Sequence, residues 1–129
     1  MELLLGLKEA MSTEAITKLA VSFRAAVEAC PRERLPITFQ SFPRGSCGDA
    51  CLLLGAWLED SGHTGFYYIC GQRNSQSHAW LQRADLIVDI TADQFGPNLP
   101  PVYVGPKSDF YMSFEQELKQ PGVVSPSVV

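Results

Sequence analysis

The sequence lacks any apolar run close to the ~20 residues that a helix needs to cross a membrane. It also lacks a basic cluster, because 10 Lys and Arg residues face 14 Asp and Glu residues and the formal net charge is −4. A mildly acidic chain of this kind is a poor ligand for nucleic acid or for an anionic membrane surface. The apolar residues 1–5 include Glu2 where a signal peptide has basic residues, and no small-residue cleavage site follows, so we expect no signal peptide.

Cysteine and histidine are scarce as well. The four cysteines are Cys30, Cys47, Cys51 and Cys70, and the chain has 2 histidines. Without a secretion signal, we expect the cysteines to be reduced thiols in the cytoplasm rather than a disulfide framework. Any cysteine chemistry must therefore be argued from where each thiol lies in the fold.

Apolar residues, in contrast, make up 46% of the 129 residues, and charged residues make up 19%. This is the balance of an ordinary globular protein, and a chain of this size can bury roughly two thirds of its unfolded surface without help from a metal or a disulfide. The chain has no internal repeat and no linker, so we expect one domain over residues 1–129.

The N-terminal region of that domain, residues 1–30, is expected to be largely helical. Residues 13–29 carry apolar side chains at spacings of three and four, and Pro31 ends the pattern. The apolar face consists of Ile16, Leu19, Ala20, Phe23, Ala26 and Val27. Residues 35–40 are expected to be a short extended piece before a loop.

A second helix is expected over residues 47–59, where apolar residues fall on nearly every side, so that it should be central and buried. After it the hydrophobic pattern alternates with a period of two, which predicts an antiparallel sheet. The expected strands are residues 66–70, 78–82, 86–91 and 102–104, with a polar, mobile loop at 71–77. Residues 110–118 fit a strand or a helix, and residues 119–129 are expected to be a flexible tail. Helices followed by an antiparallel sheet predict the α+β class.

The stretch that carries chemistry begins at Cys47, which follows a Gly-Ser loop and opens the second expected helix. A helix N-terminus presents free N–H groups and a partial positive charge, and both favour a thiolate over a thiol. Because the thiolate is the nucleophilic form, this is where a catalytic cysteine would be placed. The alternative for this position taken alone is a structural thiol, the usual role of a buried free cysteine.

Two further residues, His78 and Asp89, lie on neighbouring strands of the expected sheet. A four-residue hairpin loop places them directly opposite each other, whereas a two-residue loop, which pairs Arg83 with Leu86, makes them diagonal neighbours. Both registers put the two side chains on one face and within reach of each other. A carboxylate among apolar neighbours needs a partner, so the pair serves either catalysis or a purely structural cross-strand contact.

The segments "GSCGDACLLLGAWL", "SHAWL" and "LIVDITADQF" together resemble the papain-like superfamily, specifically its transglutaminase-like branch of small bacterial type. That branch includes transglutaminase cores, arylamine N-acetyltransferases and small bacterial thiol proteases. In these proteins the cysteine starts a helix packed on an antiparallel sheet, the histidine lies on a strand, and the aspartate lies on the next strand. The resemblance covers about residues 40–105 and implies a papain-like core with the triad Cys47, His78 and Asp89.

The resemblance implies thiol-dependent acyl hydrolysis or acyl transfer at an amide bond of a peptide or protein, which needs no metal or organic cofactor. The backbone N–H of Cys47 would stabilise the oxyanion. Gln40 is a candidate second donor, because the papain branch places a glutamine shortly before its cysteine. Asp93 and Gln94 follow the Asp89 strand and are candidates for lining the substrate cleft. Nothing resembles the calcium-loop carboxylates of animal transglutaminases, so no calcium requirement is implied.

Two other interpretations use the same residues. Cys47, Cys51, Cys70 and His78 offer four ligands to zinc, although Cys-x3-Cys on one helix is not a usual zinc spacing. A catalytically silent domain of the same fold would instead bind a peptide or a partner protein. Rapid alkylation of Cys47 alone favours the enzyme, whereas four equally slow thiols favour the binding domain.

Overall fold

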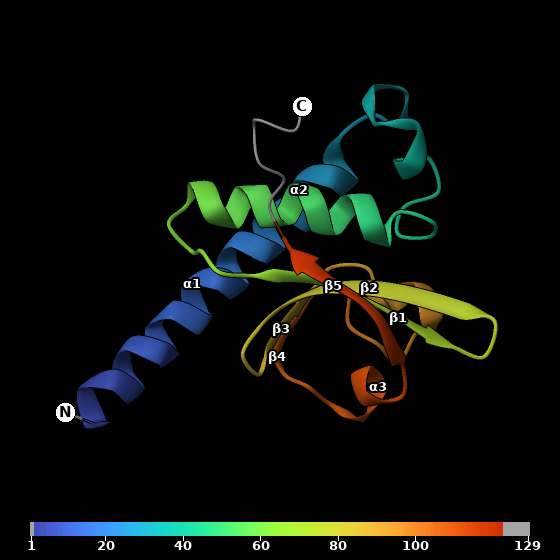
Figure 1. Cartoon of the computed structure of the whole chain (residues 1–129). Helices are drawn as coiled ribbons and strands as arrows, with labels where there is room; N and C mark the ends of the chain where they lie inside the picture. The colour runs from blue at the N-terminus through green and yellow to red at the C-terminus, as the bar shows by residue number, and fades with distance from the viewer. Residues whose placement is uncertain (1, 123–129) are drawn as a thin grey trace.

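The computed structural model describes residues 2–122, which form helices and a five-stranded antiparallel sheet (Figure 1). The α-helices are α1 (Glu2–Ala29), α2 (Cys47–Asp60) and α3 (Asp109–Met112). The strands are β1 (Tyr67–Arg73), β2 (Gln76–Arg83), β3 (Leu86–Asp89), β4 (Tyr103–Pro106) and β5 (Glu115–Pro121). Single 3₁₀ turns lie at η1 (Arg32–Arg34), η2 (Ile37–Phe39) and η3 (Ala92–Phe95). The predicted α+β class is therefore confirmed.

Helix α1 is longer than its apolar pattern predicts, because it begins at Glu2 instead of residue 13. Its core-facing side starts at Ile16, while Leu3 and Leu7 in the first turns are 79% and 55% exposed. These turns form because leucine, lysine and glutamate are good helix formers and extend a helix that is already anchored at its other end. Two positions of this helix also differ from the expected apolar stripe: Ala26 is exposed, and Arg24 is buried.

Helix α2 begins at Cys47 as predicted and ends at Asp60. It is not buried on every side, because Leu53 and Trp57 are 47% and 44% exposed. The residues that face the sheet are Ala50, Cys51, Leu54, Gly55 and Leu58. The prediction of a fully central helix was wrong since apolar residues on a surface helix do not all need to reach the core.

The segment at residues 35–40, predicted to be extended, contains the helical turn η2. Pro36 precedes this turn with a φ of −52°. A proline fixes a φ that suits the start of a helical turn as well as an extended segment. The sequence pattern alone therefore could not distinguish a helical turn from an extended segment over so few residues.

The strand order in the sheet is β4-β3-β2-β1-β5, and every neighbouring pair is antiparallel. The polar loop predicted at residues 71–77 was wrong, because β1 and β2 pair as far as Arg73 and Gln76. Only Asn74 and Ser75 form the turn, and Asn74 has a φ of 55°. Asparagine tolerates this left-handed conformation, so two residues suffice to close the hairpin.

The C-terminal part combines both of the predicted alternatives for residues 110–118. The chain first forms the single turn of α3 and then the edge strand β5, which pairs with β1. Residues 119–121 were predicted to belong to a flexible tail but complete β5, because their backbone groups pair with Tyr67, Tyr68 and Ile69. Gly122 is also described, and its backbone N–H donates to the oxygen of Phe66 at 2.9 Å, whereas residues 123–129 of the predicted tail lie outside the described residues.

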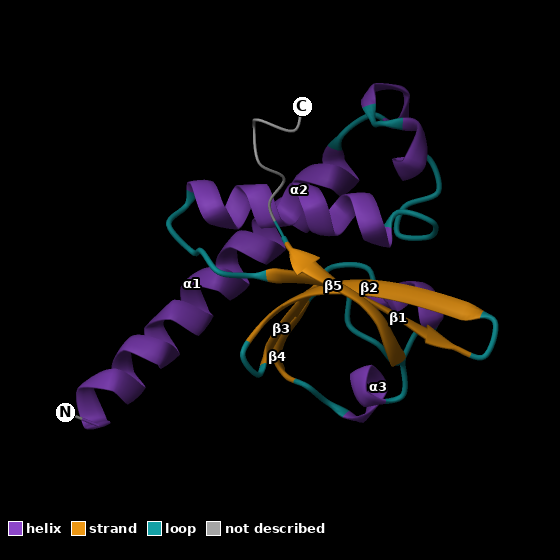
Figure 2. Ribbon diagram, viewed as in Figure 1, coloured by secondary structure: helices purple, strands orange, loops and turns teal. Residues whose placement is uncertain are grey.

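Both faces of the sheet carry buried side chains (Figure 2), although every residue of the edge strand β5 is exposed. Helices α1 and α2 pack on one face, where Ala79, Leu81 and Val88 contribute to the main hydrophobic core. The other face, on the side of α3, carries an aromatic-rich cluster of Ile69, Trp80, Ile87, Tyr111 and Phe114. Alternate residues of β2 therefore face two different cores. No helix within residues 2–122 is long and apolar enough to span a membrane.

Candidate active site

Cys47 is the first residue of α2 and is half-buried. The preceding Ser46 does not cap the helix, because its hydroxyl donates to the backbone oxygen of Pro43 at 3.2 Å. The first N–H groups of α2 therefore have no side-chain cap, and the partial positive charge of the helix end faces the thiol region. This is the setting that the sequence predicted for Cys47.

The hairpin of β2 and β3 brings His78 and Asp89 together. Arg83 pairs with Leu86 across a two-residue turn, in which Ala84 has a φ of 52°. This is the second of the two expected registers, in which His78 and Asp89 are diagonal neighbours. The Nε2 atom of His78 lies 2.6 Å from Oδ2 of Asp89, and both side chains are buried, at 0% and 1% exposure.

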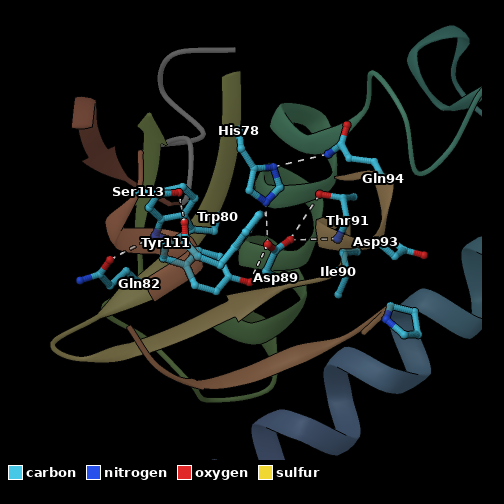
Figure 3. Close-up of polar contacts among 12 residues, drawn as sticks. His78, Trp80, Gln82, Asp89, Ile90, Thr91, Asp93, Gln94, Tyr111 and Ser113 are labelled. Atoms are coloured by element: carbon cyan, nitrogen blue, oxygen red, sulfur yellow. Dashed lines mark hydrogen bonds and ion pairs between the residues drawn. The ribbon is translucent and has the colours of Figure 1, made fainter. Parts of the chain in front are cut away.

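Asp89 is surrounded by hydrogen-bond donors (Figure 3). Its Oδ2 accepts from the hydroxyl of Tyr111 at 2.8 Å as well as from His78. Its Oδ1 accepts from the backbone N–H of Thr91 at 2.9 Å and from the hydroxyl of that residue at 3.3 Å. The buried carboxylate is thus fully satisfied, and its orientation toward His78 is fixed from both oxygens.

Sequence reasoning missed Thr91 and Tyr111. Thr91 follows Asp89 by two residues, which is the spacing at which an aspartate side chain bonds to the backbone in an Asx turn, so a signal was present. Tyr111 lies 22 residues away on α3 and reaches Asp89 only through the tertiary fold. No local pattern in the sequence links these two residues.

The thiol of Cys47 and the ring of His78 shift each other's pKa. Burial lowers the pKa of His78, but hydrogen bonds to Asp89 and Cys47 and the charges of both outweigh it and raise this pKa to about 9. Burial raises the pKa of Cys47, but the hydrogen bond and charge of His78 and a hydrogen bond to the backbone of Ala79 outweigh it, so that the net pKa is lowered. The geometry favours a thiolate beside an imidazolium.

Two other thiols, those of Cys51 and Cys70, have a raised pKa instead of a lowered one. Cys51 lies one turn further along α2, and burial raises its pKa well above the ordinary value. Cys70 on β1 has a raised pKa because of burial and the nearby charge of Cys47. Cys47 differs from both because it alone of the three has a hydrogen bond from His78.

Of the three candidate cleft residues, the structure brings only Gln94 to the histidine. The amide nitrogen of Gln94 lies 3.4 Å from Nδ1 of His78 (Figure 3). Asp93 instead binds the guanidinium of Arg24 with both carboxylate oxygens, each at 2.8 Å. Gln40 is exposed, and its amide donates to the backbone oxygens of Arg32 and Leu35.

Arg24 on α1 positions the segment that follows β3. Besides Asp93, it donates to the backbone oxygens of Ile90 at 2.7 Å and Pro101 at 3.1 Å. Its position was visible in the sequence, since it lies four residues after Ala20 on the expected apolar stripe. An arginine at such a position is buried only if acceptors meet it, and here η3 and its flanking backbone supply them.

Aromatic rings surround the imidazole of His78. Phe95 packs against it edge-on, with ring centroids 4.9 Å apart, and Trp80, Phe114 and Phe110 follow at 5.7, 5.8 and 6.0 Å. These contacts keep water from the ring and strengthen its polar interactions with Asp89. Within residues 2–122, no three His, Cys, Asp or Glu side chains are grouped so that they could hold a metal ion.

Comparison of the chain with models of protein families, with curated proteins and with solved structures finds no match. What the site can do must therefore be argued from its own geometry.

Proposed function

We propose that this protein is a thiol-dependent acyl hydrolase or acyl transferase that acts on an amide bond of a peptide or protein. Cys47 is the nucleophile, His78 is the base and acid, and Asp89 orients the ring. The observation that carries this proposal is the bridging position of His78. One side of its buried ring bonds to Asp89 at 2.6 Å, and the ring lies near enough to the thiol at the uncapped start of α2 to lower the pKa of Cys47.

The chemistry follows from these positions. The Cys47 thiolate attacks the amide carbonyl carbon, an S–C bond forms, and the π electron pair moves to the carbonyl oxygen. When this intermediate collapses, the C–N bond breaks and His78 gives its proton to the departing amine nitrogen. Water or a second amine then attacks the thioester carbon while His78 takes its proton. The S–C bond breaks, the acid or the new amide leaves, and the Cys47 thiolate and protonated His78 are restored.

The arrangement of elements supports the same proposal. Cysteine at the start of a helix packed on an antiparallel sheet, histidine on a strand, and aspartate on the next strand form the pattern of a papain-like, transglutaminase-like core. In this chain α2, β2 and β3 carry Cys47, His78 and Asp89 in that order. A fold by itself does not establish activity, so the test must address the thiol.

Selective alkylation tests the nucleophile without knowledge of the substrate. At about pH 6, iodoacetamide should label Cys47 much faster than Cys70 in the native protein, because only the thiolate reacts. The variant His78→Gln retains a polar group beside Asp89 and should remove this difference. Equal labelling of the two thiols in the wild-type protein would contradict the proposal, and a screen of peptide amides and glutamine-bearing proteins should then find no turnover.

A further inference from the structure

The second ring nitrogen of His78 is where the thiol and one more side chain meet. Since Nε2 bonds to Asp89, Nδ1 is the nitrogen left for the thiol of Cys47. The amide nitrogen of Gln94 lies 3.4 Å from the same Nδ1. The amide of Gln94 thus approaches the ring nitrogen that does not bond to Asp89 (Figure 3).

The backbone around Gln94 is fixed from both sides. The preceding Asp93 is clamped by Arg24, and the following Phe95 packs edge-on against His78. The backbone N–H of Gln94 itself donates to the oxygen of Thr91 at 3.2 Å. A half-buried amide on so constrained a turn is pre-organised, which is what electrostatic stabilisation of a transition state requires.

Building on the proposed function, we propose that Gln94 is the side-chain donor that stabilises the oxyanion formed when Cys47 attacks. The uncapped N–H groups at the start of α2 supply the backbone donor. We thereby assign to Gln94 the role that the sequence predicted for Gln40. Gln40 cannot fill it in this structure, because its amide is already bonded to the backbone of its own loop.

The protonation state of the site supports this assignment. A neutral Nδ1 of His78 accepts from the amide of Gln94. In the thiolate–imidazolium pair Nδ1 carries a proton, so that nitrogen is a donor and the amide has no acceptor there. The N–H of Gln94 is then free to donate to the negatively charged oxygen, which takes up the electron pair released as the S–C bond forms.

Two reactions of the Cys47 thiol distinguish an oxyanion donor from a residue that affects every reaction of this thiol. Acylation of Cys47 by p-nitrophenyl acetate passes through an oxyanion, whereas alkylation by iodoacetamide is a direct displacement that forms none. In Gln94→Ala, acylation should slow by ~10²–10³-fold, the usual effect of removing one oxyanion donor. Alkylation and its pH profile should stay within about twofold of wild type, because the thiolate is set by His78.

Three further variants complete the experiment. Gln94→Glu keeps the size of the side chain but replaces the donor with a negative charge, and it should acylate at least as slowly as Gln94→Ala. Gln72→Ala is the matched control, because the amide of that half-buried residue donates to the backbone oxygen of Asn74, and Gln40→Ala tests the rival glutamine. Both should acylate like wild type.

Each outcome decides between the proposals. Fast alkylation with unchanged acylation in Gln94→Ala overturns the role of Gln94 alone. Equal losses in both reactions also overturn it and make Gln94 a residue that positions His78. Wild-type Cys47 that reacts no faster than Cys70 with either reagent overturns the proposed function and this inference with it.

Discussion

At the scale of single residues, the site depends on one proton, which the thiol of Cys47 and the ring of His78 share. Cys47 and Asp89 both favour the charged form of His78, and His78 favours the thiolate of Cys47. The ring of His78 is fully buried and ordinarily would be neutral there, so its raised pKa depends on its two neighbours. Changing either neighbour should therefore alter chemistry more than it alters the fold.

Cys47→Ser should keep the fold and abolish turnover. Serine is nearly the same size and is a favoured residue at a helix start, so the free energy of unfolding should change by less than ~1 kcal/mol. Its hydroxyl does not ionise near neutral pH and is a far weaker nucleophile. Thermal melting and turnover of a substrate found by the peptide-amide screen measure the two effects. Full activity of the serine variant would exclude Cys47 as the nucleophile.

Asp89→Asn should reduce turnover by up to ~10⁴-fold, because an amide can hold the wrong tautomer of His78 and cannot offset its positive charge. Asparagine has one carbonyl oxygen in place of two carboxylate oxygens, so one of the donors around it must face an NH2 group. We expect a loss of ~1–3 kcal/mol in the free energy of unfolding. Asp85→Asn, in the exposed turn of the same hairpin, is the control. Equal turnover in Asp89→Asn and wild type would remove Asp89 from the mechanism.

At the scale of elements, helix α1 supports the site from a distance. Its residue Arg24 holds η3 through Asp93 and two backbone oxygens, and η3 carries Gln94 and Phe95 to the ring of His78. The helix thereby orders a segment that has no regular pairing of its own. A substitution of Arg24 should therefore alter the position of η3 at the site, because the contacts of Arg24 hold this turn in place.

Arg24→Met should destabilise the protein and loosen η3. Removing one partner of a buried ion pair usually costs ~3–5 kcal/mol, and we expect the lower end because Asp93 is 22% exposed. Urea unfolding measures the loss, and faster hydrogen exchange at the N–H groups of Gln94 and Gly96 would locate it. The control is Arg34→Met, which changes an exposed arginine of η1. Equal stability of the two variants would mean that the clamp does not support η3.

The elements also show which structural features a sequence reveals. The start of α2 and the alternation in β2 and β3 follow from local periodicity, so the proximity of His78 and Asp89 could be predicted. The choice between the two loop lengths could not, because both registers put the two side chains on one face. The β1–β2 hairpin could not, because polar residues in its outer half pair through the backbone and leave no hydrophobic pattern. Tyr111 and the reach of Gln94 depend on contacts between distant segments, which no periodicity encodes.

At the scale of the whole molecule, the site links folding to pH. In Cys47→Ser the thiol no longer titrates, and we expect Asp89 to keep the folded pKa of His78 above the ordinary 6.5. The contribution of protonated His78 to the free energy of unfolding is complete below pH 6.5. It is lost as pH rises from there through the raised pKa, with a limiting slope of about 1.4 kcal/mol per pH unit. The free energy of unfolding should therefore fall on the alkaline side of pH 6.5.

Urea unfolding at several pH values measures this dependence. The double variant Cys47→Ser, His78→Gln lacks the titrating ring and is the matched control. The difference between the two proteins isolates His78 from every other group that titrates in this range. A constant difference from about pH 6 to about pH 9 would contradict a raised pKa.

The turn at Asn74 and Ser75 has a consequence for how the molecule can be divided. It separates the proposed nucleophile, Cys47 on α2, from the proposed base and orienting acid, His78 on β2 and Asp89 on β3. Strand β1 belongs to the first part but lies between β2 and β5 of the second, so the two parts interlock edge to edge on both sides. Fragments cut at this turn should each be inert and should recover fast alkylation of Cys47 when mixed. The chain would then work as a split reporter, in which thiol reactivity measures reassembly.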